Sequence, residues 1–157
     1  PMEVSAAMRY LVANPGPSYI RLGKAGETTF HKNLTELKPG EWIKVRNGSD
    51  KQILLTTGAG LAIAMEWIKK PEYAHRSVYS IPIWSMEHKI NQIENLHKFD
   101  DIITIEDHLQ DGGFGSWLME AKSMDDMLTC RLRIRALNAN VCGTVGSQAT
   151  LNSFGGL

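Results

Sequence analysis

The sequence predicts an α/β protein of three layers (α/β/α), with helices on both faces of a mostly parallel sheet of about five strands. Two observations lead to this prediction. Apolar, strand-like segments alternate with helical segments through residues 50–157. The helical segments are also long enough to serve as crossovers between parallel strands, and such crossovers are right-handed.

Four strands are expected in this part of the chain. The first is a nearly continuous apolar run at 53–57, as in a strand that is buried on both faces. A helix follows at 61–70, with lysines in its last turn and Pro71 directly after it. The later elements, in order, are a strand at 77–81, a helix at 87–99, a strand at 102–106, a helix at 115–128 and a strand at 131–137. Residues 139–157 show no further helix.

The first part of the chain has a different character. Residues 3–13 have apolar side chains at helical spacing, and the sequence NPGP then ends the helix. Residues 18–22, SYIRL, are expected to form a short strand. Because one helix and one strand cannot form a core alone, residues 1–22 are interpreted as the end of a preceding α/β domain. Residues 23–49 are a polar linker with one short hairpin around Pro39 and Gly40, and residues 50–157 form the main domain.

Composition excludes several classes of function. Lys+Arg and Asp+Glu are both 17, so the sequence lacks the basic excess that nucleic-acid-binding proteins usually carry. The longest apolar run, 53–65, is too short for a membrane span. The two cysteines, Cys130 and Cys142, fit no zinc pattern and favour a reducing compartment, so we expect a cytoplasmic protein. The chain starts at Pro1 without a signal peptide, and we expect it to belong to a longer polypeptide or gene.

Most of the residues that could take part in catalysis or binding lie between Ile103 and Trp117, in the sequence ITIEDHLQDGGFGSW. Glu106, Asp107 and His108 could supply a general acid and base. Neighbouring residues on a strand point to opposite faces, however, so both carboxylates reach one substrate only if the strand has already ended. The alternative is structural: the carboxylates accept hydrogen bonds from loop amides, and His108 packs at an interface. We favour this second interpretation.

The glycines of this segment have a clearer purpose. Gly112 and Gly113 permit backbone angles that other residues avoid, and Gly115 lets the amides of the following helix approach another group closely. Ser116 is a candidate N-cap. No metal site is expected, because the histidines show no ligand spacing.

Several segments together resemble the transketolase family. They are PSYIRLGK, LKPGEWIKVRNGSDKQILLTTGAGLAIAMEW, FDDIITIEDHLQDGGFGSWLMEA and NVCGTVGSQATLNSFGGL, which span essentially the whole chain. The strongest likeness is Thr104–Ser116, which follows the family pattern almost position by position. One departure is the sequence Ile83-Trp84-Ser85, where relatives carry a Lys-Pro-hydrophobic-Asp segment, and this leaves the subfamily and the substrate open.

The resemblance implies that the chain is the C-terminal section of a thiamine diphosphate enzyme, with one strand of its sheet antiparallel to the rest. In that family the cofactor and its Mg²⁺ lie between two other domains, so this chain alone should bind neither and should not be active. The complete enzyme would be a homodimer that moves a two-carbon ketol unit between sugar phosphates. The partners of this section would be the remaining domains or a separate subunit.

The resemblance also assigns residues. The glycine turn becomes a signature of fold and interface, and its residues are Glu106, His108, Gly112, Gly113, Phe114, Gly115 and Trp117. Arg21 matches the family arginine that helps to hold the substrate phosphate, and guanidinium suits phosphate oxygens well. A salt bridge that stabilises the domain junction is an equally good role for Arg21.

Two other functions stay open. The chain could be the C-terminal part of a 2-oxoacid dehydrogenase β-type subunit. It could also be a free-standing α/β module that binds a ligand or regulator at the strand ends. The helix-strand unit at residues 1–22 favours a section of a larger enzyme, since an independent module has no use for part of a neighbouring domain.

Overall fold

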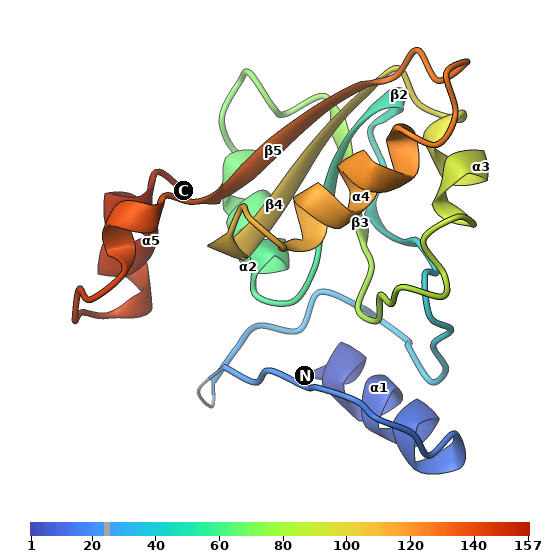
Figure 1. The fold of residues 1–157 in the computed structure, drawn as a ribbon. Coiled ribbons are helices and arrows are strands. Elements are labelled where there is room, and N and C mark those ends of the chain that lie inside the picture. Colours follow the sequence, from blue (N-terminus) through green and yellow to red (C-terminus); the bar gives the residue numbers. More distant parts are fainter. Residues whose placement is uncertain (24–25) are drawn as a thin grey trace.

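The computed structural model describes residues 1–23 and 26–157 (Figure 1). One mixed sheet holds the strands β1 (Ile43–Arg46), β2 (Ser49–Thr56), β3 (Arg76–Ser80), β4 (Asp101–Leu109) and β5 (Arg131–Leu137). The helices are α1 (Met2–Ala13), α2 (Gly60–Trp67), α3 (Gln92–Leu96), α4 (Phe114–Lys122) and α5 (Gln148–Gly155), with a short 3₁₀ turn at Ala139–Val141.

The strand order is β1-β3-β2-β4-β5. The edge strand β1 runs antiparallel to β3, and all the other pairs are parallel. The central register places Ile53 of β2 beside Ile102 of β4, and Ile102 beside Leu132 of β5. The predicted three-layer fold with about five strands and one antiparallel strand is therefore confirmed, and all four predicted strands form.

Helices cover both faces of the sheet. Alternate residues of the central strands point to opposite faces, so Leu54 packs toward α2 while Ile53 and Leu55 pack toward α3 and α4. Phe114 and Trp117 of α4 lie in the larger of these two clusters, together with Trp84. The core is thus divided by the sheet into two layers, as the sequence alternation requires.

The N-terminal region differs from prediction in one element. Helix α1 forms where the spacing predicted it, but residues 18–22 pair with no strand in the part of the chain that the structure describes. The strand prediction for SYIRL is therefore wrong for this chain. A strand needs the hydrogen bonds of a neighbour, and these residues meet none; Tyr19 is 86% exposed and Leu22 is 58% exposed.

Helix α1 packs on the linker. Ala6 and Ala7 contact Leu37 and its apolar neighbours, and the His31 ring lies 2.7 Å from the Glu3 carboxylate. The hairpin expected around Pro39 and Gly40 is wrong: a turn forms there, but the strand after it, β1, pairs with β3 as the sheet edge.

The C-terminal region contains a helix that the sequence analysis missed. Helix α5 lies beyond the carboxyl end of β5 and away from the sheet (Figure 1). Its signals were present in the sequence: Ser147 caps the amino end by accepting a hydrogen bond from the Thr150 amide, and Gly156 ends the helix in the left-handed conformation. Two other helices, α3 and α4, are shorter than predicted, because turns replace their outer parts.

Among the described residues, no helix is both long and apolar enough to cross a membrane.

Candidate functional site

The residues singled out by the sequence meet at the carboxyl end of β4. This strand continues to Leu109, so Glu106, Asp107 and His108 lie within it rather than after it. The main hydrogen-bond and ion-pair partners of the two carboxylates therefore differ, although His108 lies near both. The acid–base pair considered as one interpretation of the sequence would consist of two buried carboxylates, because the Glu106 side chain is 0% exposed and the Asp107 side chain is 3% exposed.

Glu106 caps helix α4. Its side chain is fully buried, and its two oxygens accept hydrogen bonds from the amides of Phe114 at 2.6 Å and Gly115 at 2.7 Å. A carboxylate at this position satisfies two amides that have no partner within the helix, and it also complements the positive end of the helix dipole. The close approach that the glycines were expected to allow is therefore an approach to Glu106.

The glycine turn is shaped by this contact. A Cβ atom on Gly113 would lie 2.5 Å from a Glu106 oxygen, and one on Gly115 would lie 2.6 Å from the Ile134 side chain. Gly112 has φ of +70°, which other residues avoid. Ser116 is not the N-cap that was considered; Gly113 takes that position, and the Ser116 hydroxyl donates to the Gln110 carbonyl.

Asp107 pairs with Arg21. The guanidinium Nη1 lies 2.8 Å from the Asp107 carboxylate and also donates to the Asp107 carbonyl at 3.3 Å. The Asp107 side chain is 3% exposed, whereas that of Arg21 is 43% exposed. One edge of the guanidinium is thus engaged while much of the group remains open to solvent. The structure places Arg21 at the end of β4, as part of this site.

His108 lies beside both carboxylates. Its Nδ1 is 3.1 Å from Glu106 and its Nε2 is 4.0 Å from Asp107. The ring is 33% exposed, so one side of it reaches solvent. Glu106 therefore orients the imidazole while it caps α4, and the site joins α4, β4 and the Arg21 segment through a chain of polar contacts.

Phe114 and Trp117 are buried in this chain. Their rings stack at 5.9 Å, and the indole of Trp117 donates to the Ser85 carbonyl at 3.1 Å. They support the glycine turn from within the core and are absent from the surface that this chain presents.

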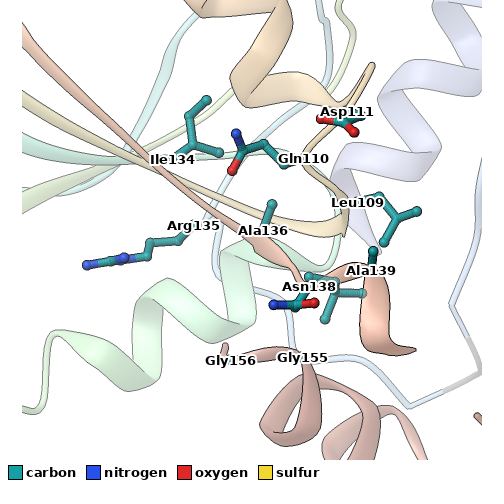
Figure 2. Close-up of a pocket in the computed structure, with 11 residues that line it drawn as sticks. Leu109, Gln110, Asp111, Ile134, Arg135, Ala136, Asn138, Ala139, Gly155 and Gly156 are labelled. Atoms are coloured by element: carbon teal, nitrogen blue, oxygen red, sulfur yellow. The ribbon is translucent and has the colours of Figure 1, made fainter. Parts of the chain in front are cut away.

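A groove of about 440 Å³ runs beside the site, between the β4–α4 turn, the end of β5 and the end of α5 (Figure 2). Gln110, Asp111 and Asn138 contribute polar side chains, the Arg135 side chain points away from these residues in Figure 2, and Gly155 and Gly156 form part of the wall nearest α5. The sequence analysis missed this groove. Its residues come from three separate segments, and no spacing within any one of them identifies it.

Cys130 and the histidines outside the site occupy positions that indicate a structural role. Burial raises the pKa of the Cys130 thiol, which disfavours the nucleophilic thiolate. Within residues 1–23 and 26–157, no group of three His, Cys, Asp or Glu side chains is arranged to hold a metal ion. The histidines outside the site have local partners, such as Gln52 for His75 and Ser85 for His88.

The fold and the site together define a three-layer α/β domain whose β4–α4 turn closes around a buried, capping carboxylate. No protein-family model matches the sequence, and no curated protein matches it. Among solved structures, the chain is similar to one described as a split gene transketolase, inactive beta4 tetramer, with a TM-score of 0.76 and 21% identity. The resemblance to transketolase is thereby confirmed at the level of the fold.

The lengths of the two proteins differ. The similarity covers 97% of this chain but only 49% of the transketolase chain. This chain therefore spans about half of the protein it resembles.

Proposed function

We propose that this chain is the C-terminal section of a transketolase-like enzyme and that it acts by packing against the sections that bind the cofactor. The fold similarity over 97% of this chain and 49% of the other carries the proposal. The whole enzyme would transfer a two-carbon ketol unit between sugar phosphates. In that assembly the site at the end of β4 is a junction between this section and its partner.

The exposed apolar residues of the N-terminal region support such a junction. Tyr19, Ile20 and Leu22 are 86%, 38% and 58% exposed, and they flank Arg21. An extended, apolar segment without a strand partner is suited to adding a strand to a partner's sheet edge. The Arg21–Asp107 contact would hold this segment beside the carboxyl end of β4, where the two sections meet.

The described residues do not fit thiamine diphosphate and Mg²⁺ by themselves. Glu106 is a fully buried carboxylate at a helix start, and both of its oxygens accept hydrogen bonds from amides of α4. Mg²⁺ prefers carboxylate oxygens in an open, octahedral arrangement, which Glu106 in its capping role does not offer. We therefore assign cofactor binding to the partner section and derive no catalytic step from this chain.

The test is reconstitution. The chain is mixed with the section that carries the cofactor-binding domains, and complex formation and ketol transfer from a ketose phosphate to an aldose phosphate are measured. We expect a complex, and activity only when both sections are present. Leu22→Glu should weaken the complex about tenfold, because it places a charge in the contact. Met124→Glu, at a side chain that is 55% exposed on another surface, is the matched control. Absence of a complex with the unmodified chain would refute the proposal.

A second candidate, a module that binds a ligand, is favoured by the groove of about 440 Å³ and its polar lining. Titration of the isolated chain with a panel of sugar phosphates, followed by calorimetry, separates the two functions. Saturable binding that is lost in Asn138→Leu would support the module, whereas absence of heat would leave the enzyme section as the function.

A further inference from the structure

Arginines occupy three alternate positions of strand β5, namely Arg131, Arg133 and Arg135. We call these three side chains the arginine stripe. Alternate residues of a strand point to the same face, so the stripe lies on one face of the sheet. The register places Arg133 beside Ile103 and Arg135 beside Ile105, and both isoleucines belong to the core layer under α2. The stripe is therefore on the α2 side of the sheet.

The arginine stripe carries more positive charge than its neighbours neutralise. Arg133 lies 2.6 Å from the Asp101 carboxylate, but Asp101 also compensates the buried Arg76. Arg131 and Arg135 are exposed, and neither has an ion-pair partner in the part of the chain that the structure describes. The whole chain has no net charge, so the stripe is a local concentration of positive charge.

Strand β5 is an edge strand, and half of its backbone groups face no other strand. The Arg131 amide donates to the Asp100 carbonyl at 2.8 Å, on the β4 side. Because backbone groups alternate in direction along a strand, the N–H and C=O groups of Leu132, Ile134 and Ala136 point away from β4. No strand lies beyond β5 among the described residues (Figure 1). Such a row of unpaired groups is a template for a further strand.

The face of β5 opposite the arginine stripe is mainly apolar. Leu132 packs against the core layer that contains α4. Ile134 and Ala136 line the groove of about 440 Å³ at the carboxyl end of β5. Figure 2 shows Asp111 at this groove and Arg135 pointing away from it. The edge of β5 thus presents positive charge on one face and, on the other, apolar side chains beside one carboxylate.

We propose that the edge of β5 binds an extended acidic segment of another protein, which adds a strand to the sheet. Acidic side chains of this segment would face the arginine stripe, and the side chains between them would be uncharged, because Asp111 repels an acid on the other face. Main-chain hydrogen bonds supply affinity in this mode of recognition, and complementary charge supplies selectivity. A second β5 edge is a poor occupant, because it would place like charges opposite one another. The proposal does not depend on the proposed enzyme function.

The experiment is a titration of fluorescein-labelled peptides of about six residues with the full chain, followed by fluorescence anisotropy. One peptide alternates glutamate and valine, and we expect it to bind saturably. A peptide with lysine in place of each glutamate should bind at least about tenfold more weakly. A peptide that has all its glutamates before all its valines keeps the charge but loses the alternation, and it should also bind more weakly.

Protein variants locate the binding site. The double variant Arg131→Ser/Arg135→Ser should raise the dissociation constant of the alternating acidic peptide about tenfold, since both arginines are exposed and would pair with glutamates. The matched control is Lys32→Ser/Lys38→Ser, which removes the same charge from exposed positions of the linker. It should leave the dissociation constant within about twofold.

N-methylated peptides test the addition of a strand. Only alternate residues of an added strand direct their N–H groups toward β5, so methylation of every glutamate amide or of every valine amide should abolish binding in at least one case. Absence of binding by the parent peptide, equal effects of the two double variants, or unchanged binding of both methylated peptides would each overturn the proposal. Tighter binding of a single-stranded oligonucleotide at the stripe would overturn it in favour of nucleic acid. Self-association of the chain that displaces the peptide would overturn it in favour of a second copy.

Discussion

Strand β4 has an acidic side chain near each end, largely buried in both cases (17% exposed at Asp101 and 3% at Asp107), and the two ends differ in where their partners come from. At the amino end, Asp101 contacts Arg76 of β3 and Arg133 of β5, the latter at 2.6 Å. At the carboxyl end, Asp107 contacts Arg21, which belongs to an exposed segment far away in the sequence. The first network joins strands of one sheet, and the second ties a separate segment to it.

The comparison shows that similar ion pairs join strands of one sheet at the amino end of β4 and hold a separate segment at its carboxyl end. Arg76 has a side chain that is 6% exposed, so it depends on Asp101 for charge compensation. Arg21 is 43% exposed and stays hydrated without Asp107. Removing the acid at the amino end should therefore lower the free energy of unfolding. Removing the pair at the carboxyl end should mainly weaken the proposed contact with the partner section.

The largest effect is expected from Asp101→Ala. The substitution leaves the buried Arg76 without its carboxylate, and breaking a buried pair from one side costs about 3–5 kcal/mol. Urea denaturation of the chain measures this loss. The control is Glu66→Ala, which breaks an exposed pair with Lys69 and should cost less than about 0.5 kcal/mol. Equal losses would show that the amino-end network has no special role in the sheet.

The contacts of Asp101 with Arg76 and Arg133 also make the free energy of unfolding depend on pH. Burial opposes the charge of Asp101, but the hydrogen bonds and charges of Arg76 and Arg133 outweigh it and hold the pKa of this carboxyl below its ordinary value. A carboxyl with a lowered folded pKa contributes stability above its unfolded pKa and loses it as the pH falls through the folded value. The stability difference between wild type and Asp101→Asn should therefore narrow below about pH 4. If the stability difference stayed constant from neutral pH to below about pH 4, the ion pairs of Asp101 would not be its cause.

Gly113→Ala should have an intermediate effect. The new Cβ would lie 2.5 Å from both the Glu106 carboxylate and the Leu109 carbonyl, so the cap of α4 must shift. Overpacking of this kind costs about 1–3 kcal/mol in thermal or urea unfolding. Gly16→Ala is the matched control, because a Cβ there meets nothing within 4 Å. A loss at Gly113 no greater than that at Gly16 would mean that the turn adapts without cost.

Arg21→Ala should have the smallest effect on the chain itself, below about 1 kcal/mol, because the arginine is partly exposed. In the reconstituted enzyme, Arg21→Ala distinguishes the two roles considered for Arg21, which are binding of the substrate phosphate and a salt bridge at the domain junction. If the open edge of the guanidinium holds a substrate phosphate, the KM for phosphorylated sugars should rise much more than that for unphosphorylated sugars. Equal losses with both substrate types would assign Arg21 to the junction alone.

The sequence predicted the sheet well because its signals are local. The apolar runs of β2 and β4, the alternation with helices and the glycines before α4 each act within a few residues. The favoured interpretation, in which both carboxylates accept hydrogen bonds from amides, is right for Glu106 and wrong for Asp107, which pairs with Arg21. Sequence reasoning failed for residues 18–22, where a strand-forming pattern lacks a neighbour, and for α5, where capping signals outweigh a weak apolar pattern.

By itself, then, the sequence determined the fold class, the four parallel strands and the glycine turn, since backbone preference and side-chain period are properties of neighbouring residues. Only the tertiary structure decided that β1 closes the sheet edge, that Glu106 caps α4, that Asp107 pairs with Arg21 and that Asp101 joins Arg76 to Arg133. These contacts join residues distant in sequence. Their formation depends on the register of the sheet and on the path of the connecting segments, which no local pattern specifies.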